Sequence, residues 1–179
     1  MKSHVAVHFA SVCVMALAAG CVQPVTDRPG NDVPPALQTP AGQTLLLQAR
    51  GHGVQIYACR AAGTGFAWAL KAPVADLLNG RGEKIGKHYA GPTWEGDDDS
   101  KVVGALKASS DSPTPGNIPW VLLSAKSNAG SGIFSSVQSV QRLHTIGGVA
   151  PAEGCDAAHA GAEVRVPYKA DYYFYGAGA

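Results

Sequence analysis

The stretch from Gln141 to Cys155 reads Gln-Arg-Leu-His-Thr-Ile-Gly-Gly-Val-Ala-Pro-Ala-Glu-Gly-Cys. Its first residues are typical of the end of a strand. The pair Gly147-Gly148 predicts a sharp turn, and Pro151 restricts the backbone after it. The stretch ends at a cysteine whose one plausible partner is Cys59, far back in the chain. It therefore predicts a turn that joins two distant parts of one domain.

The chain has four cysteines. Cys13 lies in an apolar N-terminal segment and Cys21 follows that segment, so Cys59 and Cys155 remain in the body of the chain. In an oxidising compartment two such cysteines pair. A bridge that spans nearly the whole domain stabilises it by about 4 kcal/mol in the chain-entropy account. The rival interpretation is a nucleophilic thiol near His144.

Residues 1–20 have the pattern of a secretory signal, with Lys2 ahead of an apolar run that is too short to cross a membrane. The segment Leu17-Ala18-Ala19-Gly20-Cys21 resembles the lipobox of bacterial lipoproteins. The resemblance implies that Cys21 is acylated, that it becomes the first mature residue, and that it anchors the chain to a membrane. By the same resemblance, Val22 after the cysteine favours the outer membrane. The alternative is an ordinary signal peptide that is cut near Ala19.

Composition limits the class of protein. The formal net charge is +1, which indicates no nucleic-acid partner. Residues 21–42 are rich in proline, so we expect a lipidated, extended tether without secondary structure. Residues 43–179 form one domain, and 22 glycines with few charges favour a β protein with many turns.

The domain contains about nine short runs of β-forming residues that are separated by turn signals. They predict a single-domain all-β sandwich or barrel. We expect Gly51-His52-Gly53 to separate two strands and Pro73 to interrupt a third. Residues 133–145 have helical spacing of apolar side chains but many β-branched residues, and we choose a strand with a bulge. In the last strand Tyr172 and Phe174 face one way, and Tyr173 and Tyr175 face the other.

The richest candidate site follows the strand predicted at 84–89. There His88, Tyr89, Trp94 and Glu95 are expected to line a ligand pocket, with Trp94 stacked on a sugar or another ring and with His88 and Glu95 as hydrogen-bonding groups. The competing structural interpretation makes Trp94 a core residue, pairs Glu95 with a lysine or arginine, and leaves His88 as a solvated strand residue.

Other candidates are weaker. Asp97-Asp98-Asp99 lacks the alternation of a calcium loop, and no zinc motif occurs, so we expect no metal. No dinucleotide fingerprint surrounds Gly51-His52-Gly53, and we expect no cofactor. Tyr173 and Tyr175 either form an exposed platform or pack within the fold. Arg142 and His144, placed together on one face, either bind an anion or pair with Asp or Glu across strands.

Several motifs together resemble one secreted family of bacterial and fungal proteins, the Domain of Unknown Function 3455 family. They match in order from about Leu45 to Tyr175. They are Gln55-Ile56-Tyr57-Ala58-Cys59, His88-Tyr89-Ala90-Gly91-Pro92-Thr93-Trp94-Glu95, Pro119-Trp120-Val121-Leu122-Leu123, Gln141-Arg142 with Thr145-Ile146-Gly147-Gly148, Ala150-Pro151, Cys155, and Tyr168 through Tyr175. The resemblance implies no catalytic residues.

These observations favour an envelope lipoprotein that acts as a binding or structural module and whose ligand is a small molecule, a glycan or a protein. The runner-up is an extracytoplasmic, hydrolase-like enzyme with its site around His88 and Glu95. No Gly-x-Ser-x-Gly motif supports that alternative.

Overall fold

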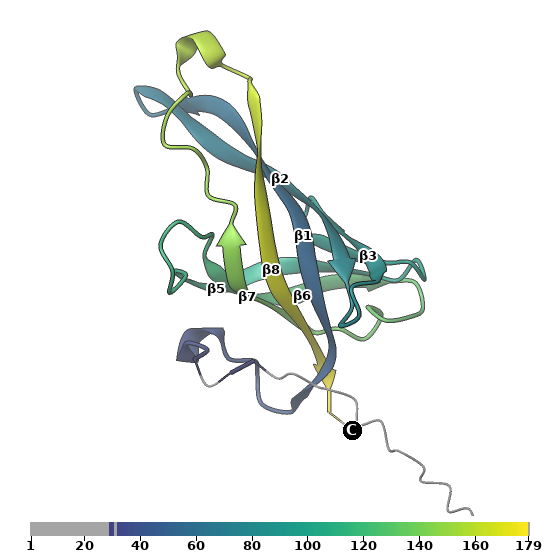
Figure 1. Ribbon diagram of the computed structural model, residues 1–179. Helices are drawn as coiled ribbons and strands as arrows, with labels where there is room; N and C mark the ends of the chain where they lie inside the picture. The colour runs from purple at the N-terminus through teal and green to yellow at the C-terminus, as the bar shows by residue number, and fades with distance from the viewer. Residues whose placement is uncertain (1–28, 31, 179) are drawn as a thin grey trace, which may run out of the picture.

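The computed structural model describes residues 29–30 and 32–178 and has eight antiparallel strands in that range (Figure 1). The strands are β1 (Gln43–Ala62), β2 (Gly65–Leu78), β3 (Lys84–Tyr89), β4 (Thr93–Gly96), β5 (Lys101–Ser110), β6 (Trp120–Ala129), β7 (Ser139–Gly147) and β8 (Glu163–Ala177). Two short 3-10 turns, η1 (Pro35–Leu37) and η2 (Ala157–His159), complete the elements. Neither has the length or the apolar character that a helix needs to cross a membrane, and no other helix lies in the described range.

Each strand pairs with the next along the chain, and β8 returns to pair with β1, so the sheet closes into a barrel. The prediction of an all-β sandwich or barrel is therefore confirmed as a single closed sheet. The strand number is eight rather than about nine, because two runs predicted to be separate strands belong to one long strand.

That long strand is β1, which passes through Gly51-His52-Gly53 without a turn. The two glycines are required by close packing. A Cβ on Gly51 would lie 2.4 Å from the Tyr172 ring, and one on Gly53 would lie 2.1 Å from the Val74 carbonyl oxygen. The prediction of two strands was wrong because a glycine that makes room for a neighbour looks the same in sequence as a glycine in a turn.

Strand β2 likewise continues through Pro73. Its pairing with β1 skips Lys71, since Ile56 is opposite Ala72 and Tyr57 is opposite Leu70. Pro73 itself stays in register, opposite Gln55. The predicted interruption at Pro73 was therefore wrong, and the one irregularity of this pairing lies two residues earlier, at Lys71.

Apolar side chains form two clusters on the two faces of the sheet. The inner cluster lies inside the barrel and includes Trp94, Val140, Tyr172 and Phe174. The outer cluster lies on β6, β7 and β8 and includes Trp120, Leu122, Leu143, Tyr173 and Tyr175. The predicted alternation along β8 is confirmed. Tyr173 and Tyr175 are only 3% and 8% exposed, so they are no exposed platform.

The outer cluster is covered by the segment before the first strand. Val33 and the fully buried Leu37 pack on it, and Gln141 Nε2 donates to the Leu37 carbonyl at 2.6 Å. We expected no secondary structure up to Gly42, whereas η1 forms at Pro35–Leu37. This segment is ordered because Val33 and Leu37 bury their side chains against the apolar outer face of β6–β8. The sequence of the segment alone does not show that this face is available.

Residues 133–138 are not part of a strand, although a strand was predicted from 133 to 145. Phe134 and Val137 are buried there because they fill the inner cluster from a loop. Asn128 Nδ2 donates to the carbonyls of both residues, at 2.9 and 3.0 Å, and so satisfies backbone groups that a strand would otherwise pair.

Strands β1, β2 and β8 extend together beyond the ring toward η2 (Figure 1). Cys59 of this extension is bonded to Cys155, with the two Cα atoms 5.3 Å apart, which confirms the predicted disulfide and excludes a free thiol at either position. Gly147, the last residue of β7, and Gly148, which forms a bridge with Asn117, both have positive φ, a conformation that favours glycine. A bridge of this kind is consistent with an exported protein.

The signal peptide predicted for residues 1–20 and the acylated Cys21 lie outside the described residues.

Candidate functional site

The four residues predicted to share a pocket are divided between the two faces of the sheet. His88 and Trp94 are register partners on β3 and β4 and face the interior, where they are 3% and 1% exposed. Tyr89 and Glu95 alternate with them and face outward. The structure therefore brings His88 to Trp94 and Tyr89 to Glu95, but it does not bring His88 to Glu95.

His88 is held as a neutral imidazole. Its ring stacks on Trp94, with centroids 4.5 Å apart and planes 11° apart, and Nδ1 lies 2.9 Å from the Thr93 carbonyl oxygen. Since a carbonyl only accepts, Nδ1 carries the proton and Nε2 the lone pair. Burial lowers the pKa of His88 to about 3 despite the hydrogen bond. The expectation of a solvated histidine was wrong, and the expectation that Trp94 is a core residue was right.

Glu95 belongs to an ion-pair network on the outer surface. The Tyr89 hydroxyl donates to it at 2.5 Å, and the ammonium groups of Lys87 and Lys101 each lie 3.2 Å away. These contacts, the Tyr89 hydroxyl first, lower the pKa of Glu95 to about 2. The pairing with lysine is what the structural interpretation predicted, and the carboxylate is engaged by its neighbours.

A pocket of about 340 Å³ lies inside the barrel beside His88 and Trp94. Every one of the eight strands contributes to its lining. Val121 and Leu123 line it from β6, and Leu70 and Leu106, which are 58% and 65% exposed, also line it. Exposed leucines at an interior hollow mark the place where it opens to solvent. Of the four residues expected to line a pocket, His88 and Trp94 line this one, whereas Tyr89 and Glu95 do not.

Arg142 is the principal charged group of this pocket. It is opposite Val121 and Tyr172 in register, on the inward face of β7, and its Nη2 donates to the Pro119 carbonyl at 2.8 Å. Its Nε is buried and has no hydrogen-bond partner. Among the described residues, no carboxylate forms an ion pair with Arg142.

Two further buried polar atoms of the lining lack a partner. They are Oε1 of Gln55, a residue that is 2% exposed, and Nε1 of Trp94. A buried polar group without a hydrogen bond costs about 1–3 kcal/mol, so such groups are rare in folded proteins. The described residues contain five such atoms, and three of them lie around this one pocket.

Tyr168 and Tyr172 place two neutral hydroxyl groups near Arg142. Their hydroxyl oxygens are 3.1 Å apart, and burial raises the pKa of both. A hydrogen bond with Arg142 acts in the opposite direction on the pKa of Tyr172. Neither tyrosine can therefore supply the negative charge that Arg142 lacks.

His144 is separated from Arg142, although the sequence placed the two on one face. It adopts a positive φ of 48° at an irregularity between Leu143 and Ile146, which turns it to the outside. There Nδ1 lies 3.0 Å from Asp171, and Nε2 lies 3.8 Å from Asp32. The expected cross-strand pairing with an acidic residue thus holds for His144 and fails for Arg142.

The acidic loop has a structural role. Asp98 accepts hydrogen bonds from the Ile133 N–H at 2.8 Å and from the Ser100 hydroxyl at 2.6 Å, which ties two loops together. These bonds, that of the Ser100 hydroxyl first, lower the pKa of Asp98. Within residues 29–30 and 32–178, no group of three His, Cys, Asp or Glu side chains is placed to hold a metal ion.

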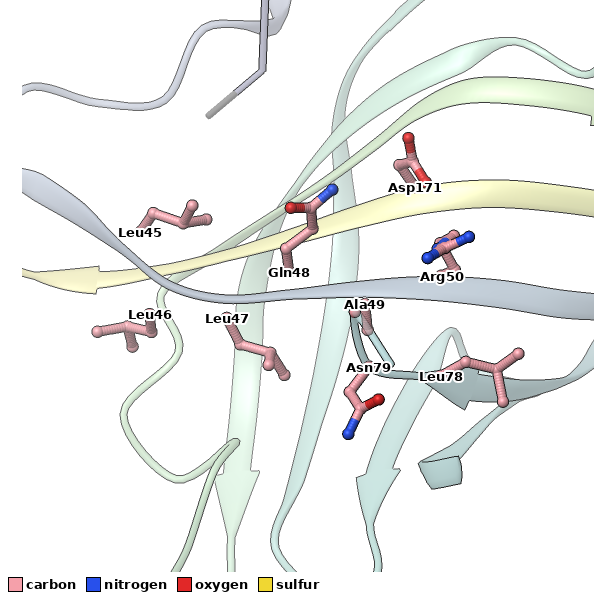
Figure 2. Close-up of a pocket in the computed structure, with 10 residues that line it drawn as sticks. Leu45, Leu46, Leu47, Gln48, Ala49, Arg50, Leu78, Asn79 and Asp171 are labelled. Carbon is pink, nitrogen blue, oxygen red and sulfur yellow. The ribbon is translucent and has the colours of Figure 1, made fainter. Parts of the chain in front are cut away.

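A larger hollow of about 800 Å³ runs along the first half of β1 (Figure 2). Figure 2 shows that its lining comes from both faces of the strand, with Leu47 and Ala49 on one side and Gln48, Arg50 and Asp171 on the other. Arg50 and Asp171 are register partners and carry opposite charges. None of the lining side chains has a buried polar atom without a partner, so we favour the smaller interior pocket as the site.

Sequence reasoning did not identify Gln55 or Tyr172 as pocket residues, and it considered Arg142 only together with His144, as a pair that binds an anion or an acidic side chain. The available signal was alternation, since Val140 and Arg142 are two residues apart and share a face. An arginine on the apolar face of a strand is the pattern that would have found the site.

The family described as "Protein of unknown function (DUF3455)" matches residues 40–176. No curated protein and no solved structure matches the chain.

Proposed function

The chain belongs to the family of proteins of unknown function DUF3455, and we propose that it is an exported binding module that holds one small, largely apolar molecule inside its barrel. The observation that carries this proposal is the set of partnerless polar atoms around an otherwise apolar hollow: Arg142 Nε, Gln55 Oε1 and Trp94 Nε1. Ligand sites typically combine apolar walls with a few converging polar groups.

The size of the pocket limits the ligand. About 340 Å³ is near the lower end of the range for small-molecule sites, which argues against a polymer or a protein segment as the occupant. The exposed Leu70 and Leu106 at the opening gain burial when a ligand enters, so they add to its affinity.

A catalytic role for His88 and Glu95 has no comparable support. The two side chains lie on opposite faces of the sheet, and Nδ1 of His88 is engaged with Thr93. A hydrolase would need both groups within reach of one substrate.

The binding proposal is tested with a neutral environment-sensitive dye, N-phenyl-1-naphthylamine, titrated into the purified protein. We expect its fluorescence to rise with saturation, and we expect Leu106→Ser to weaken binding by about tenfold because a side chain at the opening is lost. Ile146→Ser is the matched control, since Ile146 is 62% exposed against 65% for Leu106 but does not line the pocket. Equal affinities of the two variants, or no saturable binding, would refute the proposal.

We also propose that the module is held on a membrane, in the outer membrane of the cell envelope, by acyl chains on Cys21. Support comes from the lipobox-like residues 17–21, from Val22 after the cysteine, and from the Cys59–Cys155 bridge, which suits an oxidising compartment. The proline-rich residues between Cys21 and the docked Leu37 act as the spacer. Mass spectrometry of the mature N-terminus is the test, and an unmodified Cys21 or a start at another residue would remove the anchor.

A further inference from the structure

We infer that the ligand of the interior pocket is a small organic anion, with an apolar body and one carboxylate or equivalent oxyanion that pairs with Arg142. This inference rests on the proposed binding function and specifies its ligand class. It follows from the charges of the pocket, from the free donor of Arg142, and from the shape of the remaining walls.

The pocket has an excess of positive charge. Its lining contains Lys71 and Arg142 and no Asp or Glu. Lys71 is already paired with Glu163 outside the lining, which leaves Arg142 as the uncompensated charge. An arginine does not lose its proton in a protein, so its charge persists in the interior at any ordinary pH.

The titratable groups that face Arg142 cannot neutralise its positive charge. Burial raises the pKa of Tyr57, Tyr168 and Tyr172 and lowers that of His88. All four groups are therefore neutral near pH 7. Arg142 is half-buried and has no opposite charge among these groups, and an anionic ligand would supply one.

Arg142 also has the donors for an oxyanion. Nη2 donates to the Pro119 carbonyl and the Tyr172 hydroxyl is a further hydrogen-bonding neighbour, but Nε has no partner. The planar guanidinium can donate two parallel hydrogen bonds to a carboxylate, a geometry that an ammonium lacks. The same geometry serves a carboxylate, a sulfonate or a phosphate monoester.

The rest of the wall is suited to an apolar body. Val121, Leu123, Leu70 and Leu106 provide aliphatic surface, and the Trp94 indole provides an aromatic one. A ligand with one anionic group at Arg142 and an apolar body therefore matches both the charged and the apolar parts of the lining.

The test uses two matched ligand sets, 3-phenylpropionate with 3-phenylpropionamide, and hexanoate with hexanamide, in isothermal titration calorimetry with the purified protein. Each amide has the skeleton of its acid without the charge. We expect each carboxylate to bind at least about tenfold more tightly than its amide, the difference that a charge-assisted hydrogen bond provides. We expect the preference to disappear in Arg142→Gln, to survive in part in Arg142→Lys, and to remain unchanged in Arg165→Gln, which removes an exposed guanidinium.

The outcomes separate the two proposals. Equal binding of acid and amide by the unsubstituted protein overturns the anion inference and leaves the binding function intact. A carboxylate preference that is lost equally in Arg142→Gln and Arg165→Gln overturns the assignment to Arg142. Binding of none of the four compounds, with dye binding retained, overturns the ligand class alone. If dye binding also fails, the binding function falls with it. The comparison within the unsubstituted protein remains decisive even if an Arg142 variant does not fold.

Discussion

Removal of the Cys59–Cys155 bridge gives the clearest test of how this barrel is stabilised. The double substitution Cys59→Ala and Cys155→Ala opens a loop whose ends are 96 residues apart in sequence. In the chain-entropy account, closing a loop of that length stabilises the folded state by about 4.7 kcal/mol at 25 °C. A domain of this size has a total stability of about 5–15 kcal/mol, so the loss would approach or exceed a third of it.

The folded state should persist without the bridge, because the loop has other contacts. The Tyr57 hydroxyl donates to the Gly148 carbonyl at 2.7 Å, and Trp68 Nε1 donates to the Glu153 carbonyl at 2.9 Å. The free energy of unfolding therefore decreases mainly because the unfolded state becomes more expanded without the bridge. Urea unfolding followed by tryptophan fluorescence should show a lower midpoint together with a larger m-value.

The matched control is Trp68→Phe, which removes one contact of the same loop and leaves the bridge. It should lower the free energy of unfolding by only about 0.5–1.5 kcal/mol, the usual contribution of one hydrogen bond. A loss below about 1 kcal/mol for the double variant, with an unchanged m-value, would refute the reasoning. So would two reactive thiols in the unfolded, unreduced protein beyond any contributed by Cys13 and Cys21.

Three further perturbations test the interior, the outer cluster and the long strand. Because the pKa of His88 is about 3 in the fold and about 6.5 in an unfolded chain, only the unfolded chain takes up a proton between those values. The unsubstituted protein should therefore lose up to about 1.4 kcal/mol per pH unit, as pH falls from 6.5 toward 3, relative to His88→Asn. Urea midpoints against pH measure this, and parallel curves would contradict it. Leu37→Ala should cost about 2–5 kcal/mol in urea unfolding, whereas Leu46→Ala, at a residue that is 43% exposed, should cost far less. Equal losses of unfolding free energy in the two variants would show that the segment around Leu37 does not stay packed on the outer cluster. Gly53→Ala should abolish folding or lower the thermal midpoint strongly, since its Cβ would lie 2.1 Å from a backbone oxygen, while Gly65→Ala, with open space around it, should fold normally. A normal midpoint for Gly53→Ala would refute the packing role of that glycine.

Features of the fold that depend only on residues close together in sequence can be predicted from the sequence. The positive φ of Gly147 and Gly148 is a conformation that glycine adopts without strain, and the alternation along β8 follows from the two-residue period of a strand. The pairing of Cys59 with Cys155 followed from counting, because only two cysteines remain beyond the N-terminal region.

The errors have a common physical cause. Gly51, Gly53 and Pro73 were interpreted as breaks, but their roles depend on the strands beside them, which sequence order does not show. Leu37 lies in a proline-rich segment, which predicts an extended tether, but its burial depends on the outer face of β6–β8.

The sequence by itself determined that this is an all-β domain with one long-range disulfide, since strand periodicity, turn residues and cysteine number are properties of the chain alone. Only the tertiary structure decided where the proposed site lies. Closure of eight strands places Gln55, Trp94 and Arg142 around one hollow, although they are far apart in sequence. The same closure leaves Arg142 without a carboxylate, because the inward-facing neighbours of an arginine are set by register between strands and not by the residues next to it in the chain.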